Sequence, residues 1–288
     1  MNSGSGSGDL HDVAGRIVAA FTAHGIEPTV ALVPGSQVGE AARRALQEGA
    51  SLVVAGGGDG TVSTVASALA GTGAALGVLP LGTLNHFAKD LRIPLDLEAA
   101  VQTIVAGHSV AVDLGDVNGR LFINNASLGL YPRLVWEREK EQRAGRGKWR
   151  ALAIAAVRVW RHYRRVDVIL NNDKRGPVVR TPFVFIGNNE YELEGFQVGR
   201  RQRLTDGCLQ VCTAPHMTRM EFVRVVAGAF TGRLRAEEHF ESLCAKEFSI
   251  EARRSRLGVT LDGELYVMTM PLLFRIRPAM LRVLVPAS

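Results

Sequence analysis

The sequence predicts an α/β protein of two domains, an N-terminal doubly wound parallel sheet followed by a mainly antiparallel, β-sandwich-like domain. Helix and strand patterns alternate over the first 107 residues, as in a parallel sheet covered by helices on both faces. Beyond that region most segments read as strands, and Asn118-Gly119 signals a type I′ hairpin. The expected domains are residues 1–112, rejoined by the C-terminal segment 278–288, and residues 113–277.

Apolar periodicity places the elements of the first region. Apolar side chains recur at helical spacing from Leu10 to Phe21, between a capping Asp9 and a terminating Gly25. Short apolar runs that end in glycine or proline predict buried strands between the helices. The further expected helices are 39–48, 61–70, 84–91 and 97–107, and the expected strands are 29–33, 51–55 and 75–79.

In the second region, period-2 runs bounded by turn residues predict strands. Residues 110–116 and 120–127 are expected to form the Asn118-Gly119 hairpin, and a highly charged helix is expected over 132–163. One further helix, 219–230, interrupts the strands. The remaining expected strands are 166–171, 178–187, 207–214, 247–251, 257–261, 265–270 and 272–277.

Composition and charge narrow the function classes. The chain has 288 residues, of which 47% are apolar and 22% charged, so intrinsic disorder of the whole chain is excluded. No run of 18 apolar residues exists, which argues against a spanning helix, and no secretory leader is expected. The net charge of +6 points to an anionic partner: a nucleotide, an anionic membrane surface or a nucleic acid. A cytoplasmic protein is expected.

The three cysteines, Cys208, Cys212 and Cys244, fit neither a CxxC motif nor a four-ligand zinc pattern. We expect reduced, buried side chains that behave as small apolar residues.

A glycine-rich turn follows the strand expected at 51–55. It reads Gly56-Gly57-Gly58-Asp59-Gly60-Thr61, and a helix is expected to begin at once. Glycines let the backbone approach a ligand, and the N–H groups of a helix start suit phosphate. A carboxylate beside phosphates, here Asp59, is explained by Mg²⁺ or by a bridging water. The turn matches neither GxxxxGK[ST] nor GxGxxG, and the alternative is a tight turn with Thr61 as the helix cap.

A second polar turn follows the next strand. Residues 80–90 read PLGTLNHFAKD, with Thr83 and Asn85 as uncharged hydrogen-bonding groups near a helix start. Successive strands of a parallel sheet end at the same edge, and open α/β sheets bind ligands there. The two turns are therefore expected to lie together.

This pair of motifs, GGGDGT at 56–61 and PLGTLNHFA at 80–88, resembles the catalytic domain of diacylglycerol and sphingosine kinases. The resemblance is closer to their bacterial soluble lipid-kinase relatives, and it extends over almost the whole chain. The later stretches that carry it are Val112–Gly115, Phe122–Gly129, Phe185–Asn189, Leu204–Leu209 and Leu261–Glu264.

The resemblance implies two domains, with ATP and Mg²⁺ as cofactors and the hydroxyl of a lipid such as diacylglycerol as acceptor. It implies Glu264 as the proton acceptor, Asp262 beside it near Mg²⁺, and a catalytic role for Asp59. It also implies a secondary Mg²⁺ site from Asp206 and the carbonyls of Arg203 and Cys208. The nucleotide-binding residues that it implies are Gly56, Gly57, Gly58, Asp59, Gly60, Thr61, Val62, Ser63 and Thr83.

The geometry of the late motif has two interpretations. In an extended strand, Asp262 and Glu264 would face the same side, so both carboxylates would enter the site together. Alternatively, Asp262-Gly263-Glu264 is a hairpin turn.

Some residues depart from the family pattern. Members often have Asn-Glu where Ser63 and Thr64 stand, and Asp where His86 stands. These departures make a non-catalytic lipid- or nucleotide-binding protein one alternative. A NAD-kinase-like enzyme is the other, because NAD kinases share a GGDG turn and a related sheet, although the PLGTLNHFA segment argues against it. Residues 2–6, Asn-Ser-Gly-Ser-Gly, read either as a flexible tail or as the family's first phosphate turn without its preceding strand.

A basic segment, Arg133–Arg165, interleaves eleven Arg and Lys residues with Trp136, Trp149 and Trp160. It reads either as a solvated helical face with aromatic residues in the core or as a peripheral contact with an anionic membrane. No motif supports nucleic-acid binding. The expected partners are a membrane lipid, the anionic membrane surface and, as a further candidate, a second copy of the chain.

Overall fold

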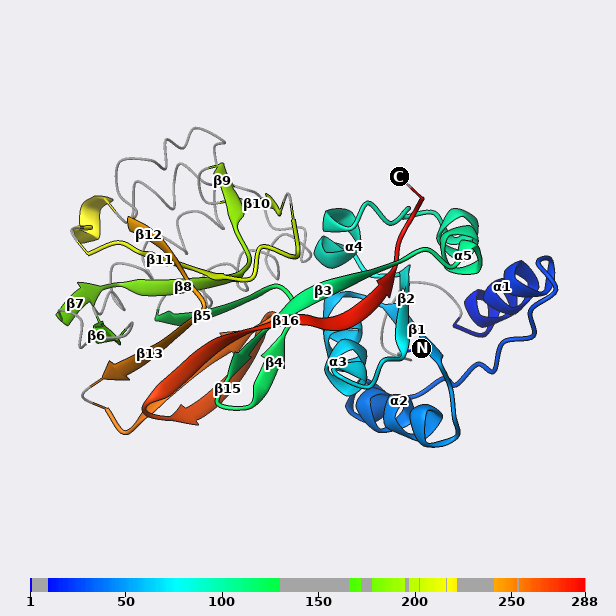
Figure 1. Ribbon diagram of the computed structural model, residues 1–288, viewed down its shortest axis with the longest axis horizontal. Coiled ribbons are helices and arrows are strands. Elements are labelled where there is room, and N and C mark those ends of the chain that lie inside the picture. The colour runs from blue at the N-terminus through cyan, green and yellow to red at the C-terminus, as the bar shows by residue number, and fades with distance from the viewer. Residues whose placement is uncertain are drawn as a thin grey trace. The chain divides into compact units, whose positions relative to one another are not determined.

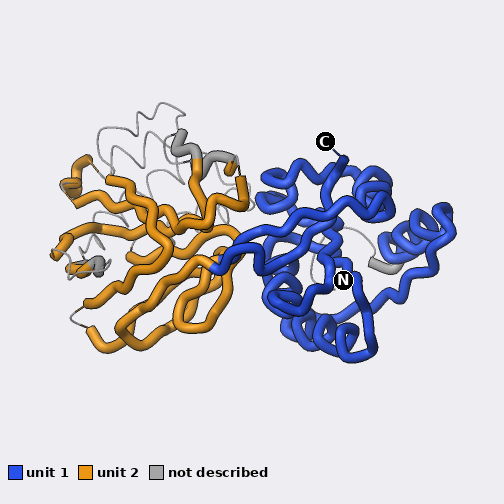
Figure 2. The backbone as a smooth tube through the Cα atoms, in the orientation of Figure 1, with its two compact units in different colours: residues 1–114, 277–288 blue, residues 115–276 orange. Residues whose placement is uncertain are grey.

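The computed structural model describes residues 1, 10–129, 166–171, 178–194, 197–201, 203–215, 217–221, 241–252 and 254–287. The chain forms two compact units (Figure 2). Unit 1 comprises Met1–Leu114 and Arg277–Ser288, and unit 2 comprises Gly115–Ile276. The expected helix 132–163 and nearly all of the expected helix 219–230 lie outside the described residues.

Unit 1 alternates helices and strands, as the apolar periodicity predicted. Its strands β1 and β2 pair in parallel, and the end of β16 pairs in parallel with β2 on its other side. Helices lie on both sides of these strands (Figure 1). The elements are α1 (Leu10–Thr22), a 3₁₀ turn (Gly35–Gln37), α2 (Val38–Gln47), β1 (Leu52–Gly57), α3 (Asp59–Leu69), β2 (Ala75–Pro80), α4 (His86–Asp90) and α5 (Leu97–Ala106).

Close packing of α5 on the sheet depends on a glycine in β2. A Cβ at Gly77 would lie 3.1 Å from side-chain atoms of both Ile104 and Val54. Asp96 caps α5 by accepting the Ala99 N–H at 3.0 Å, and Gly107 ends it in the left-handed conformation. These local signals explain why the bounds of α5 were predictable.

Residues 29–33 do not form the predicted strand. Only Val33 makes a strand-like contact, donating its N–H to the carbonyl of Met1 at 3.0 Å. The amino group of Met1 in turn donates to the carbonyl of Ala31 at 2.7 Å. The apolar run suited a strand, but within the described residues no neighbouring strand completes a ladder beside it.

Unit 2 is a β-sandwich. One layer is antiparallel, in the order β12-β11-β8-β5-β14-β15, and the other contains β16, β13, β6 and β7. Both layers contribute to one core, in which Ile186 and Val259 are fully buried and Phe248 stacks on Phe274. The strands are β3 (Ser109–Val117), β4 (Arg120–Phe122), β5 (Asn125–Gly129), β6 (Val166–Asn171), β7 (Val178–Thr181), β8 (Phe183–Asn188), β9 (Tyr191–Glu194), β10 (Gln197–Arg201), β11 (Leu209–Thr213), β12 (Glu241–Ala245), β13 (Glu247–Ala252), β14 (Arg256–Leu261), β15 (Glu264–Thr269) and β16 (Leu272–Leu284).

The Asn118-Gly119 hairpin is confirmed, with φ of 49° and 83° at its two turn residues. The strand predicted at 120–127 is instead divided into β4 and β5, and the one at 178–187 is divided at Pro182. The strand predicted at 272–277 continues to Leu284 as β16. Three strands, β9, β10 and β12, were not predicted.

The expectation of three reduced cysteines is wrong for two of them. Cys208 and Cys244 form a disulfide with a Cα–Cα distance of 5.8 Å, whereas Cys212 is free and buried. Cys208 directly precedes β11, and Cys244 lies on β12, the strand that pairs with it. The pairing of the two strands brings the cysteines together, and it could not be foreseen without β12.

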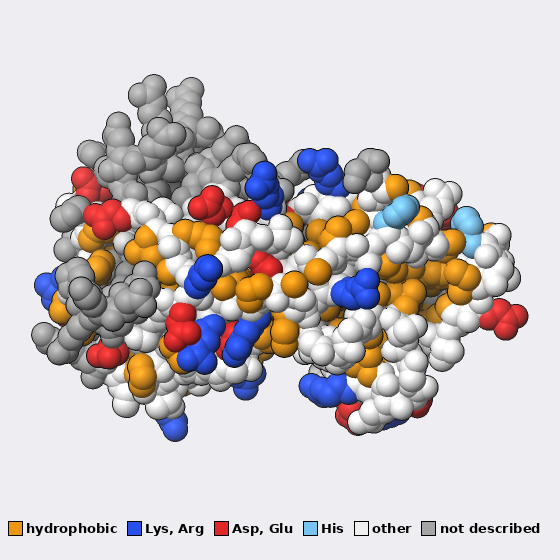
Figure 3. Space-filling model, in the orientation of Figure 1, with side chains coloured by type: hydrophobic (Ala, Val, Ile, Leu, Met, Phe, Trp, Pro, Cys, Tyr) orange, Lys and Arg blue, Asp and Glu red, His pale blue; other side chains and the backbone are white. Residues whose placement is uncertain are grey.

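No helix among the described residues is both long and apolar enough to cross a bilayer. On the face shown in Figure 3, basic and acidic side chains of the described residues are interspersed rather than gathered by sign. The basic segment Arg133–Arg165 lies outside the described residues.

Candidate active site

The two polar turns of unit 1 lie side by side, as expected from the strand order. Gly57 at the end of β1 is opposite Pro80 at the end of β2, and Leu81 extends the ladder by donating its N–H to Gly57 at 3.1 Å. Both turns therefore leave the sheet at the carboxyl ends of adjacent parallel strands, where open α/β sheets bind ligands.

The contact between these turns is made by glycine against glycine. A Cβ at Gly82 would overlap the Cα of Gly58, and one at Gly58 would lie 3.4 Å from the Cα of Gly82. Gly57 is also constrained, because a Cβ there would lie 2.5 Å from Oγ1 of Thr61. Backbone approaches backbone here, which leaves main-chain groups rather than side chains to line the turn.

Asp59 joins the starts of two helices. It is the first residue of α3, and its Oδ1 accepts the N–H of Phe87 in the first turn of α4 at 3.2 Å. Its second carboxylate oxygen has no hydrogen bond or ion pair with any described residue. The half-buried side chain of Asp59 therefore connects the two motifs and keeps one oxygen for a ligand.

The start of α3 has no side-chain cap. Its N-cap is Gly58, so Thr61 is not the capping residue, and the helix begins two residues before it. Val62 donates its N–H to the Gly58 carbonyl at 3.1 Å and buries its side chain in the core. Of the nucleotide-binding residues expected here, Val62 thus offers a ligand neither its N–H nor its side chain.

Asn85 closes the second turn instead of facing a ligand. It is buried and left-handed, with φ 51°, and its amide donates to the carbonyls of Pro80 at 3.1 Å and Gly82 at 2.8 Å. Its Oδ1 accepts the Gly82 N–H at 3.1 Å. Thr83, within this turn, is exposed, as is His86.

The two departures in α3 have different surroundings. Thr64 donates its hydroxyl to the Gly60 carbonyl at 2.8 Å, and its methyl group would lie 3.2 Å from a Cβ at Gly39 in α2. Ser63 is half-buried in the first two turns of the helix.

In unit 2, the late motif is a hairpin turn. Asp262 and Gly263 have φ of 46° and 91°, and Leu261 is paired directly with Glu264 across them. Positive φ at both turn residues reverses the chain, so the expected extended geometry, with Asp262 and Glu264 facing one side, is wrong.

The Asp262 carboxylate binds the backbone between β4 and β5. It accepts the N–H groups of Ile123 at 2.9 Å, Asn124 at 2.8 Å and Asn125 at 3.1 Å. The Asp262 N–H donates in return to the Asn125 carbonyl at 2.9 Å. These hydrogen bonds lie where the strand predicted at 120–127 is interrupted. They occupy both oxygens of Asp262, the carboxylate that was expected near Mg²⁺.

A buried polar network holds the other side of the same turn. Arg201, only 2% exposed, donates to the Ile123 carbonyl at 2.7 Å and to Oδ1 of Asn124 at 2.8 Å. Asn188 also donates to the Ile123 carbonyl, at 2.9 Å, and the Tyr191 hydroxyl donates to the Asn124 carbonyl at 2.9 Å. Asn188 belongs to Phe185–Asn189, one of the stretches that carry the family resemblance, but no sequence signal indicated Arg201.

Glu264 begins β15 and is exposed. Its Oε2 accepts the Tyr266 hydroxyl at 2.6 Å, and the Arg120 guanidinium lies 4.6 Å from the centre of the Tyr266 ring. The hydrogen bond to Glu264, followed by burial and the negative charge of Glu264, raises the pKa of Tyr266. Neither Tyr266 nor Arg120 was expected from the sequence, although Tyr266 is two residues from Glu264, on the same face of a strand.

The residues expected at a secondary Mg²⁺ site lie on one loop before β11. Arg203 and Asp206 are exposed, and the Cys208 carbonyl accepts the Asn189 N–H at 3.0 Å. Among the described residues, Asp206 does not belong to any group of three or more metal-ligand side chains.

Comparison with known proteins assigns both units. The family described as "Diacylglycerol kinase catalytic domain" matches residues 1–117. The family described as "YegS C-terminal NAD kinase beta sandwich-like domain" matches residues 135–285, more than half of the chain.

Two individual relatives are similar to this chain over different lengths. "Probable lipid kinase YegS-like" of Yersinia pestis (strain Pestoides F) is 45% identical over 115 residues, 37% of this chain and 39% of that protein. "Uncharacterized protein sll0036" of Synechocystis sp. (strain ATCC 27184 / PCC 6803 / Kazusa) is 28% identical over 246 residues, 84% of this chain and 56% of that protein. The chain thus spans about two fifths to little more than half of these relatives' lengths.

The fold has solved counterparts. The crystal structure of a diacylglycerol kinase from Bacillus anthracis str. Sterne superposes with a TM-score of 0.68 at 19% identity, covering 99% of this chain and 94% of that one. With both units matched in order, the chain belongs to the diacylglycerol-kinase catalytic-domain superfamily, in the YegS-like lipid kinase family.

Proposed function

We propose that the protein transfers the γ-phosphoryl group of ATP to the hydroxyl group of a membrane lipid such as diacylglycerol. One observation carries this proposal: Gly58 and Gly82 meet at the carboxyl ends of β1 and β2, with Asp59 tied to the start of α4 beside them. Family membership supports a phosphotransferase, and this geometry supports nucleotide binding in unit 1.

The glycine turn suits polyphosphate because phosphoryl transfer depends on positioning and on charge neutralisation. The backbone from Gly58 to Gly60 would present main-chain N–H groups at the start of α3, and exposed Thr83 would add a hydroxyl. The second carboxylate oxygen of Asp59 would coordinate Mg²⁺, either directly or through a water molecule. When bound, Mg²⁺ would spread the charge of the phosphates.

In unit 2, we assign Glu264 as the proton acceptor. The lipid oxygen forms a bond to the γ-phosphorus, the bond from that phosphorus to the bridging oxygen of ADP breaks, and Glu264 takes the hydroxyl proton. Tyr266 is a positioning residue, since its hydroxyl fixes one carboxylate oxygen of Glu264. We assign Asp262 to positioning as well, because its three backbone hydrogen bonds fix the hairpin that carries Glu264.

Two rivals have specific support. The second unit matches a domain described as NAD kinase beta sandwich-like, and this likeness of fold keeps a NAD-kinase-like small-molecule kinase as a rival. His86, where members often carry Asp, together with Ser63 and Thr64 favours a non-catalytic binding protein. The secondary Mg²⁺ site at Asp206 and a peripheral membrane contact through Arg133–Arg165 stay proposals.

An assay with radiolabelled ATP tests the three functions together. Lipids dispersed in detergent, including diacylglycerol, ceramide and sphingosine, are compared with NAD as acceptors. We expect label in a lipid product, loss of it in Asp59→Asn, and full activity in Asp96→Asn. The new amide in Asp59→Asn can still accept the Phe87 N–H, so a loss of transfer would report the missing charge. The control Asp96→Asn keeps a side chain that can cap α5.

Transfer of the label to NAD alone would show that NAD, and not a lipid, is the acceptor. Binding of ATP without any transfer would establish the non-catalytic rival, and unchanged transfer by a folded Asp59→Asn protein would contradict the role of Asp59.

A further inference from the structure

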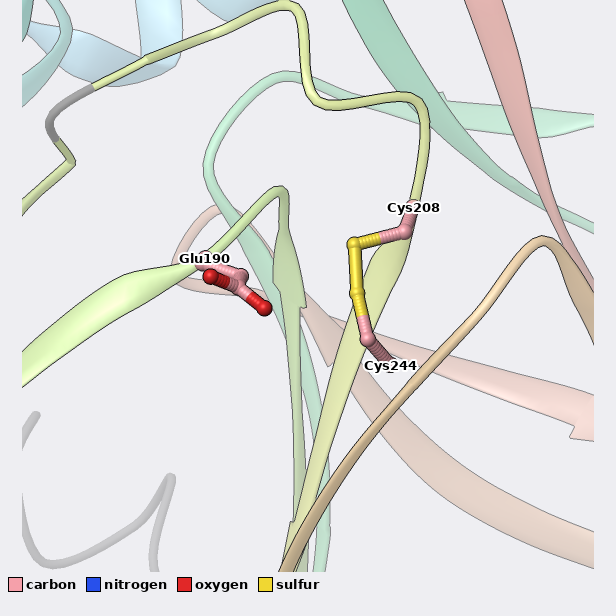
Figure 4. Close-up of side chains that lie close together, drawn as sticks. All are labelled: Glu190, Cys208 and Cys244. Carbon is pink, nitrogen blue, oxygen red and sulfur yellow. A yellow bond between two sulfur atoms is a disulfide. The ribbon is translucent and has the colours of Figure 1, made fainter.

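Three metal-ligand side chains gather on unit 2, and their side chains have no part in the proposed phosphoryl transfer. A carboxylate oxygen of Glu190 and the sulfur atoms of Cys208 and Cys244 all lie within 4.8 Å of one another. Figure 4 shows the Glu190 carboxylate turned toward the two sulfurs. Glu190 and Cys244 are exposed and Cys208 is half-buried, so solutes reach the group.

Backbone pairing brings these residues together independently of the disulfide. Strand β11 lies between β8 and β12 in the six-stranded sheet, and Gln210 of β11 is opposite Cys244. Beyond β8, Asn189 bridges to Leu209 and donates its N–H to the Cys208 carbonyl at 3.0 Å. Cleavage of the disulfide therefore leaves three ligands held on adjacent segments.

An unsatisfied polar side chain adjoins the group. Asn189 is wholly buried, has a left-handed φ of 67°, and finds no hydrogen-bond partner for either its Oδ1 or its Nδ2 among the described residues. Buried polar atoms are nearly always paired, and an orphan often marks a water or an ion. This polar position immediately precedes Glu190.

The donor set selects a class of ion. Two thiolates and one carboxylate suit zinc, whereas Mg²⁺ and Ca²⁺ take oxygen ligands. Tetrahedral bonds of about 2.3 Å to sulfur and about 2.0–2.2 Å to oxygen hold ligand atoms about 3.5–3.8 Å apart. The observed group lies within 4.8 Å, so small side-chain rotations would complete it. Three protein ligands leave a fourth position for water.

We propose that Glu190, Cys208 and Cys244 form a zinc-class metal site in the dithiol state of the protein and that the disulfide is its metal-free, oxidised state. Two equivalents of a small thiol reduce the disulfide: each cysteine sulfur gains one electron and one proton, and the two small thiols become a disulfide. The bound ion then displaces the two cysteine protons to solvent. The site lies beside the Arg203–Cys208 loop but does not depend on kinase activity.

The test compares two states of one wild-type protein. It is prepared as the disulfide and as the dithiol, metal is removed, and each form is titrated with Zn²⁺ and, for its thiolate–cobalt absorption, with Co²⁺. We expect one tightly bound ion per dithiol chain, cobalt–thiolate absorption, proton release, and no such binding by the disulfide form. Comparing the two forms requires no substitution, so misfolding of a variant cannot explain the result.

Variants then assign the ligands. Cys208→Ser and Cys244→Ser should abolish the cobalt–thiolate absorption, and Glu190→Gln should weaken Zn²⁺ binding by at least about 10-fold. Cys212→Ser and Glu241→Gln are matched controls outside the group and should bind as wild type. Equal Zn²⁺ binding by the disulfide and dithiol forms, or a dithiol form that binds no better than Cys208→Ser, would overturn the proposal. A purely structural disulfide would give the latter result.

Discussion

The carboxylate of Asp262 holds the backbone of Asn124, with Oδ1 accepting the Asn124 N–H at 2.8 Å. The same oxygen accepts the N–H of Asn125, and the other oxygen accepts that of Ile123. One side chain on a hairpin thus satisfies three consecutive N–H groups of a distant turn. Within the late motif, Asp262 therefore has an architectural role, and Glu264 is left as the proposed proton acceptor.

Replacing Asp262 should chiefly lower the stability of the folded protein, because its carboxylate binds backbone N–H groups. Asp262→Asn offers one acceptor oxygen, leaves an N–H of the 123–125 turn unsatisfied, and should lower the free energy of unfolding by about 1–3 kcal/mol. Urea denaturation followed by circular dichroism measures the change. Exposed Asp206 provides the control: Asp206→Asn, measured without metal, should unfold as wild type.

Glu264→Gln tests the proton acceptor. The amide retains the size of the side chain and can accept the Tyr266 hydroxyl, but it lacks basicity, so kcat should fall on the order of 10²-fold or more. ATP binding, measured by calorimetry, should persist. Glu247→Gln removes a carboxylate that pairs with Arg275 and should retain full kcat. Unchanged kcat in Glu264→Gln would reject the assignment, and loss of ATP binding would move Glu264 to the metal site.

Gly82→Ala should disrupt the crossing of the two turns. The new Cβ would overlap the Cα of Gly58, so the turns must separate, and nucleotide affinity should fall at least about 10-fold along with the melting temperature. Gly15 in α1 is the matched control, because a Cβ there meets nothing within 4 Å. Gly15→Ala should be neutral or stabilise by about 0.5–1 kcal/mol. Wild-type nucleotide affinity in Gly82→Ala would show that the close contact is unnecessary.

The Tyr266 hydroxyl should titrate at a higher pH than the hydroxyl of an ordinary tyrosine. Its pKa is raised, first by its hydrogen bond to Glu264, so its folded pKa lies above the unfolded value near 10. The sign follows: the stability that it contributes is complete below the unfolded pKa and is lost as pH rises through the folded pKa. Ultraviolet difference spectra of wild type and Tyr266→Phe isolate this titration. Glu264→Gln should bring it back toward about pH 10, and a Tyr266 that titrates no later than an ordinary tyrosine in wild type would contradict the assignment.

The basic segment predicts electrostatic membrane docking. Each Arg or Lys near an anionic surface contributes about 1 kcal/mol, so liposome binding should rise with anionic lipid and fall with salt. Co-sedimentation with neutral and anionic vesicles at two salt concentrations measures it. Replacing Arg133, Arg138 and Lys140 by Gln should weaken binding to anionic vesicles only. Liposome binding that is independent of lipid charge and of salt would reject electrostatic docking. It would favour the alternative, in which the segment is a solvated helical face with its aromatic residues in the core.

Features set by neighbours in the sequence were predictable. The glycines before α3, the Asp96 cap and the Asn118-Gly119 turn act within a few residues, and each is where the sequence placed it. Asp262-Gly263 carries the same turn signal as Asn118-Gly119, yet the strand interpretation fails there because positive φ at both residues reverses the chain. Local turn chemistry was the better guide at both hairpins.

Features set by distant partners were not predictable. The buried guanidinium of Arg201 donates to carbonyl groups that are more than 10 residues away in the sequence. The residues next to Arg201 in the sequence give no sign of these partners. The Cys208–Cys244 pairing depends on β12, a strand whose exposed residues lack an apolar pattern. Tertiary pairing determines both.

The path of β16 constrains the order in which the protein folds during synthesis. Its last part, around Arg282 and Val283, supplies the strand beside β2, and Met280 accepts the Gly71 N–H at 2.8 Å. A ribosome that has made the first 114 residues has therefore made an incomplete parallel sheet, with an open edge at β2. Unit 2 must be translated before that edge is covered, so nascent chains should gain ATP affinity only after the C-terminal strand emerges.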